Sequence, residues 1–131
     1  MHQDVQSISD HATHHSSRIK SALEALLGRA GQDSFVIFKE RKSEKFVQFA
    51  GSAQEPLLFD LPSIPLNTGE MERAKAFFAK LGVSPGPLHN EHVTFQLKLN
   101  RNVDRASEIT LSVFRDVYCF PPSFELDVIE N

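Results

Sequence analysis

The sequence predicts a single α+β domain in which three helices pack on an antiparallel sheet. Between residues 34 and 61, three short runs of aromatic and branched residues alternate with short polar connections, the pattern of a three-stranded antiparallel meander. The helical stretches before and after this region each have one apolar stripe, which needs a sheet to bury it. The predicted order is helix, three strands, helix, strand, helix, with one or two strands after the meander.

The composition of the chain excludes several classes of protein function. The 131 residues are 40% hydrophobic and 24% charged, with a net charge of −3, which does not provide the basic surface that nucleic-acid or anionic-membrane binding needs. A single cysteine excludes an intrachain disulfide and fits a reducing compartment. No apolar run approaches the roughly 20 residues of a membrane helix, and the N-terminus does not resemble a secretory signal. We therefore expect a soluble cytoplasmic protein without a cofactor.

Residues 1–15 are polar and lack a clear period, so they predict a flexible tail, with the domain covering residues 16–131. The tail contains His11, His14 and His15, and transition metals favour clustered imidazoles. No acidic partner motif accompanies them, so we interpret these histidines as solvated and predict no metal site.

A helix is predicted to begin at Ser16 or Ser17, which are suitable caps, and to end at Gly28 or Gly31. Its apolar residues recur at helical spacing and form one face. They are Ile19, Ala22, Leu23, Leu26, Leu27 and Ala30.

The first strand of the meander, residues 35–38, is apolar on both faces, which predicts a central place in the sheet. In the second strand, Gln48 interrupts an apolar alternation. It either faces water at an edge or makes a deliberate hydrogen bond, because burial without a partner costs about 1–3 kcal/mol. We favour the exposed interpretation. The third strand follows Pro56 and covers residues 57–59.

The second helix has specific boundary signals. Asn67 and Glu70 form a capping box, Leu66 and Met71 supply the matching hydrophobic staple, and Gly82 ends the helix.

The last third of the chain predicts a strand and a helix. Residues 92–99 alternate strictly between apolar and polar, which indicates a half-buried strand, and an edge strand is a place where another chain can pair. The third helix is predicted to begin at Val103 or Asp104 and to end near Tyr118. Residues 124–129 form either a short strand or a docked tail.

No catalytic constellation emerges. The glycines do not have the spacing of a phosphate-binding loop, and Cys119 lies between two aromatic residues, which predicts packing. His89, Glu91 and His92 stand at a junction of loop and strand, but no further carboxylate or hydroxyl is placed to complete a triad. We therefore predict that the protein is not an enzyme.

The amino-acid sequences of four segments resemble those of proteins with the type III secretion chaperone-like fold, in particular the TY-Chap and YbjN-like bacterial domains. The segments are FVQFAGS (46–52), LLFDLPS (57–63), PLNTGEMERAKAFFAKLG (65–82) and VFRDVY (113–118). The resemblance spans about residues 17–120 and implies a domain that binds peptide segments or partner proteins without enzymatic activity. Secretion chaperones typically have two strands between the second and third helices, whereas this chain predicts one.

The sequence thus predicts a non-enzymatic bacterial domain that binds a protein or peptide, or a second copy of itself as a homodimer, on exposed apolar sheet surface. The candidate partner-binding residues are Phe35, Ile37, Phe46, Gln48, Phe95 and Leu97. The alternative is a small-molecule-binding or enzymatic α+β domain with a pocket between sheet and helices, which would use His89, Glu91 or His92.

Overall fold

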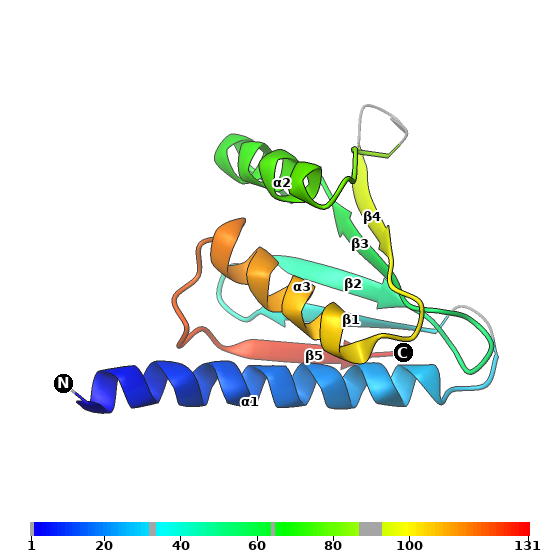
Figure 1. Ribbon diagram of the computed structural model, residues 1–131, viewed down its shortest axis with the longest axis horizontal. Helices are drawn as coiled ribbons and strands as arrows, with labels where there is room; N and C mark the ends of the chain where they lie inside the picture. Colours follow the sequence, from blue (N-terminus) through cyan, green and yellow to red (C-terminus); the bar gives the residue numbers. More distant parts are fainter. Residues whose placement is uncertain (1, 32–33, 64, 87–92) are drawn as a thin grey trace.

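The structure, a computed structural model, describes residues 2–31, 34–63, 65–86 and 93–131, without side chains for residues 2–12. The described residues form three helices and a five-stranded antiparallel sheet (Figure 1), which confirms the predicted α+β class. The elements are α1 (His2–Leu27), β1 (Phe35–Glu40), β2 (Phe46–Ala50), β3 (Leu58–Pro62), α2 (Thr68–Lys80), β4 (Thr94–Lys98), α3 (Val103–Asp116) and β5 (Leu126–Glu130).

The strands lie in the order β4-β3-β2-β1-β5, and all neighbours are antiparallel. β1 is interior, as its two apolar faces predicted, and β4 forms one edge, as predicted. The C-terminal segment is a strand, β5, which returns beside β1 and forms the other edge. At the centre of the sheet, Ile37 of β1 lies opposite both Gln48 of β2 and Ile129 of β5.

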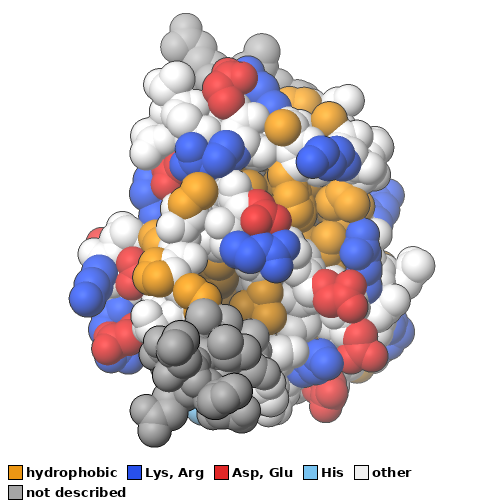
Figure 2. Space-filling view, turned by 60° about the vertical axis from the view of Figure 1, so that its left-hand side comes forward, with side chains coloured by type: hydrophobic (Ala, Val, Ile, Leu, Met, Phe, Trp, Pro, Cys, Tyr) orange, Lys and Arg blue, Asp and Glu red, His pale blue; other side chains and the backbone are white. Residues whose placement is uncertain are grey.

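The helices pack on one face of the sheet. In Figure 1, α3 crosses in front of β1 and β2, while α1 runs along the side of β5. Ser16 of α1 is hydrogen-bonded to Ser107 of α3 at 3.3 Å, and Lys20 pairs with Asp104 at 3.3 Å. Figure 2 turns the left-hand end of this view toward the reader and shows basic and acidic side chains interspersed with groups of hydrophobic ones. Such mixed charge is typical of a solvated surface.

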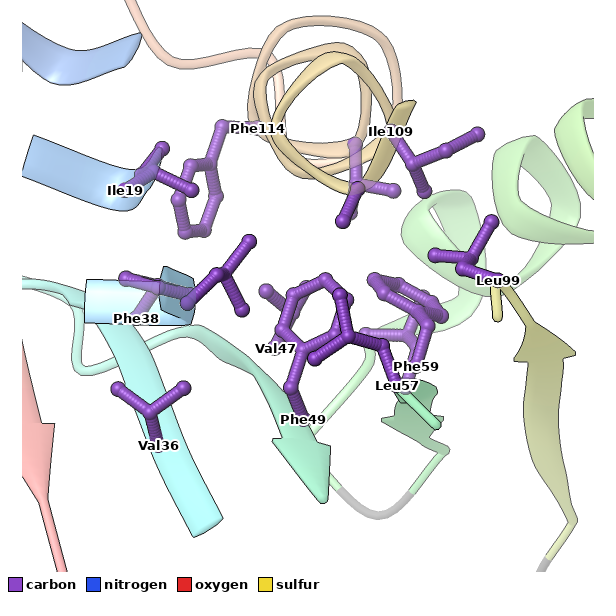
Figure 3. Packing of buried hydrophobic residues seen from close by; sticks show 14 of the residues in the cluster. Ile19, Val36, Phe38, Val47, Phe49, Leu57, Phe59, Leu99, Ile109 and Phe114 are labelled. Carbon is purple, nitrogen blue, oxygen red and sulfur yellow. The ribbon is translucent and has the colours of Figure 1, made fainter. Parts of the chain in front are cut away.

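One hydrophobic core fills the space between the helices and the sheet (Figure 3). Phenylalanine rings form a continuous series across it, with centroid separations of 5.9 Å for Phe38 and Phe49, 5.4 Å for Phe49 and Phe59, 5.7 Å for Phe59 and Phe78, and 4.9 Å for Phe78 and Phe95. Other buried members are Ile19, Leu23 and Leu26 of α1, Ala74 of α2, Ile109, Val113 and Phe114 of α3, and Val36, Val47, Leu61 and Leu126 of the strands.

Helix α1 begins at His2, whereas the sequence predicted a tail over residues 1–15 and a helix start at Ser16 or Ser17. The C-terminal segment supplies a reason that local sequence does not contain. His15 is buried, and its ring stacks on Phe124 with centroids 4.4 Å apart. This contact stabilises the helical turn before Ser16. The other end agrees with expectation, because α1 ends at Leu27, directly before Gly28.

The predicted capping box of α2 is present. The side chain of Asn67 accepts a hydrogen bond from Glu70 N–H at 2.8 Å, and Glu70 Oε1 accepts one from Asn67 N–H at 3.0 Å. Lys45 Nζ also lies 2.9 Å from Glu70 Oε1, so the cap connects α2 to the start of β2. Gly82 follows the helix with φ of 74°, a left-handed conformation that favours glycine.

The packing predicted for Cys119 is wrong, because its side chain is exposed. The aromatic residues on either side of it turn inward instead. The Tyr118 hydroxyl donates to Phe46 O at 2.7 Å, and the ring of Tyr118 stacks on Phe120 with centroids 5.4 Å apart. Cys119 has φ of 62°, and this left-handed backbone directs the chain out of α3.

We predict that Phe49→Ala lowers the free energy of unfolding by about 3–5 kcal/mol, because it removes a fully buried ring that contacts two others. Urea unfolding of the purified protein measures this loss. Phe35→Ala is the matched control, since Phe35 is only half-buried on the other face of the same sheet. An equal loss in both variants would contradict the placement of the core.

We predict that His15 makes stability fall as pH is lowered. Burial lowers the pKa of His15, which outweighs the opposing effect of the Phe124 backbone. The unfolded chain therefore binds the proton more readily, and stability is lost as pH falls from the unfolded-state pKa of about 6.5 through the lower folded-state pKa.

His15→Phe retains a stacking ring but cannot be protonated, so its unfolding free energy should depend less on pH over this interval. His14→Phe, at the exposed neighbour, should keep the dependence of the wild type. Urea unfolding measured at several pH values compares the three proteins, and equal slopes for wild type and His15→Phe would refute the assignment.

Candidate functional site

The face of the sheet opposite the helices is the candidate site, and we call it the open face. Cross-strand partners share a face, so the register identifies its residues. Among the described residues, the buried side chains of α1, α2 and α3 pack against the other face of the sheet. The open face contains Phe35, Ile37 and Lys39 of β1, Phe46, Gln48 and Ala50 of β2, Leu58, Asp60 and Pro62 of β3, Thr94, Gln96 and Lys98 of β4, and Asp127 and Ile129 of β5.

A shallow hollow of about 390 Å³ lies at the centre of the open face. Apolar side chains form much of its lining, and polar groups occupy the part over β2, β3 and β4. The lining residues are Phe35, Ile37, Gln48, Phe49, Ala50, Leu58, Asp60 and Gln96. Beside them on β5, Ile129 keeps 41% of its surface exposed. The hollow thus combines apolar contact area with a few oriented polar groups, as binding sites do.

Asp60 is the centre of the polar part. One carboxylate oxygen accepts a hydrogen bond from Gln48 Nε2 at 2.8 Å, and the other accepts one from the Thr94 hydroxyl. Gln48 is therefore half-buried on an interior strand and hydrogen-bonded, so the favoured interpretation as an exposed edge residue is wrong and the hydrogen-bonding alternative is correct. Neutral side chains hold the carboxylate in place from both neighbouring strands.

No cationic side chain in the described part of the chain forms an ion pair with Asp60. By contrast, Asp127 at the margin of the open face pairs with Arg41 at 2.8 Å, and this pairing lowers the pKa of Asp127. The half-buried centre of the open face thus has a negative charge that the described side chains do not compensate by a direct ion pair.

The structure divides the predicted partner-binding residues between the two faces. Phe35, Ile37, Phe46 and Gln48 all lie on the open face. The other two, on β4, do not.

Phe95 is fully buried opposite Leu61, and its ring stacks on Phe78. Leu97 lies opposite Phe59 and packs against the core. The strand alternates as predicted, but its apolar set faces the helices, so Phe95 is a core residue and Leu97 is partly buried against the core.

The residues that sequence reasoning missed are Leu58, Asp60, Gln96 and Ile129. Asp60 had a recognisable signal, because it is the one charged residue in the apolar run LLFDL. Gln96 could be found only through the register, which places it opposite Asp60. The other predicted polar candidates, His89, Glu91 and His92, lie outside the described residues.

The described residues contain no group of three histidine, cysteine, aspartate or glutamate side chains that is suited to hold a metal ion. None of the helices in that part of the chain is long and apolar enough to cross a membrane.

Comparisons with known proteins give no match: no family model, no curated protein and no solved structure matches this chain. The geometry of the open face therefore provides the basis for assigning a function.

We predict that Asp60→Ala lowers the free energy of unfolding by about 1 kcal/mol, because it leaves the Gln48 amide and the Thr94 hydroxyl without their shared acceptor. Asp60→Asn keeps an acceptor oxygen and should lose less. Urea unfolding of the two variants measures the difference. If Asp60→Ala were as stable as the wild type, the cluster would not contribute to holding the sheet together.

Proposed function

We propose that this chain is a non-enzymatic protein-binding domain and that its open face receives a polypeptide segment of a partner. The observation that carries the proposal is the one-sided packing of the sheet. Apolar side chains occupy both faces of β1, yet the described helices cover only the face of Val36 and Phe38. Phe35 and Ile37 remain half-buried on the other face, beside an exposed Ile129. Ile37 and Ile129 are direct cross-strand neighbours on this face, and adjoining apolar side chains at a surface favour an interaction site.

The open face is favoured over the edges of the sheet. At β5, the Leu126 carbonyl accepts a hydrogen bond from Arg18 Nη1 at 2.7 Å, and directly after the strand the Asn131 carbonyl accepts one from Arg29 Nη1. At β4, the Thr94 carbonyl accepts a hydrogen bond from Gly86 N–H at 2.7 Å, and Lys98 is exposed. Occupied carbonyls and an edge lysine both discourage pairing with an added strand. Binding across the face requires none of these groups to move.

The resemblance to TY-Chap and YbjN-like domains supports the same function, because those domains bind peptide segments or partner proteins. On this basis we place the protein in the bacterial cytoplasm. The chain departs from the secretion chaperones in having one described strand, β4, between α2 and α3. The region that differs takes part in the dimer interface of the secretion chaperones. We therefore assign the partner to the open face.

A pull-down from a lysate of the source organism, read by mass spectrometry, tests the proposal. Phe35→Asp and Ile37→Asp place a charge within the apolar part of the open face and should each abolish capture of the partner. Ala76→Asp is the matched control, because Ala76 is exposed on α2 and should retain capture. Each variant must first show wild-type folding by circular dichroism. Capture that both open-face variants retain would refute the proposal.

Sedimentation of the same proteins distinguishes the homodimer from a different partner. A second copy on the open face would produce a concentration-dependent dimer in the wild type and a monomer in Ile37→Asp. A monomer at all concentrations in both proteins would exclude a second copy as the occupant.

A further inference from the structure

We propose that the partner presents an arginine or lysine side chain, with apolar residues beside it, to Asp60 at the centre of the open face. This inference rests on the proposed function and specifies the chemistry of the partner. It follows from the position of one half-buried carboxylate within the hollow of the open face.

Asp60 accepts hydrogen bonds from Gln48 and Thr94, which are both neutral, and no ion pair among the described residues includes it. While the face is exposed, water solvates the remaining lone pairs of the carboxylate. A partner that covers the hollow removes that water, and a buried carboxylate without a compensating charge is costly. A cationic side chain of the partner would offset this cost.

Gln96 places a second hydrogen-bond acceptor beside Asp60. Gln96 lies directly opposite Asp60 on β4, and its exposed side chain makes no hydrogen bond within the described part of the chain. Its amide oxygen and the carboxylate of Asp60 are therefore neighbouring acceptors. Arginine presents several N–H groups in one plane and matches such a set better than the single ammonium of lysine. We expect arginine to be preferred.

Apolar residues of β1 and β5 lie on the same face of the sheet as Asp60. Asp60 lies opposite Gln48, and Gln48 lies opposite Ile37. Ile37 in turn lies opposite Ile129. Adjacent strands are about 4.8 Å apart, so Ile37 on β1 lies roughly 10 Å from Asp60 on β3. An extended segment that crosses the strands covers this distance within about two to four residues. The expected recognition sequence is therefore a basic residue with a large apolar residue at that spacing.

Lys98 is a positively charged neighbour of Asp60 on the open face, and removing its charge tests the role of charge in binding. It projects from β4 on the open face, opposite Leu58 and diagonal to Asp60, and is exposed. It forms none of the ion pairs among the described residues. Its positive charge repels a basic segment that approaches Asp60. Removal of this charge should therefore leave binding of such a segment unchanged or strengthen it.

Selection of short random peptides displayed on phage, with the full chain as the immobilised target, provides the probe. The selected peptides should contain arginine or lysine two to four positions from a large apolar residue. In titration calorimetry, Asp60→Asn should lower the affinity for the selected peptides by about tenfold or more, while Lys98→Gln should not lower this affinity. Glutamine in place of the basic residue should weaken binding to the wild type similarly, with little further effect in Asp60→Asn, because the two changes remove the same interaction.

The outcomes separate this inference from the function on which it rests. Peptides that require Ile37 but need no basic residue, or that bind Asp60→Asn as well as the wild type, would overturn the inference and leave the proposed function intact. Failure to select any peptide that is lost in Ile37→Asp would overturn both. A homodimer that occupies the open face and disappears in Ile37→Asp would also overturn the inference, since the occupant would then be a second copy.

Discussion

The series of phenylalanine contacts from Phe38 through Phe49, Phe59 and Phe78 to Phe95 is the interaction on which the rest of the structure depends. It joins β1, β2, β3 and β4 to α2 and so determines which side chains of each strand face the helices. Because side chains alternate along a strand, the same contacts determine which residues form the open face. A shift of one residue in any strand would exchange the two sets. The candidate site is therefore a consequence of core packing.

Polar contacts at one end of β2 hold the helices on the covered face. Lys45, directly before β2, pairs with Glu70 of the α2 cap, and the carbonyl of Phe46 accepts the hydroxyl of Tyr118 at the end of α3. Burial raises the pKa of Tyr118, so its hydroxyl stays protonated and remains a donor. Arg73 of α2 also donates to Val117 O at 2.8 Å. Lys45 and Phe46 thus connect the start of α2 and the end of α3 to β2. The side chains that β2 directs to the open face take no part in these contacts.

The fold class, the interior place of β1, the edge position of β4 and the cap of α2 were predictable, because each depends on local periodicity or on short-range signals. The start of α1 was not, since the contact between His15 and Phe124 joins residues that are distant in the chain. Phe95 and Leu97 were assigned to a surface because alternation shows which residues share a face but not which face is covered. Asp60 was recognisable as the one charged residue in LLFDL, but only the register placed it between Gln48 and Gln96.

The position of Asp60 addresses a difficulty that an uncovered apolar face creates. A sheet surface with Phe35, Ile37 and Leu58 on one side of the molecule favours contact with any apolar surface. A hydrated carboxylate at its centre makes such contacts unfavourable unless the approaching surface compensates the charge. Gln48 and Thr94 hold the carboxylate from both sides without neutralising it. The apolar residues thus provide contact area, and we expect Asp60, which no described side chain pairs as an ion, to favour partners of opposite charge.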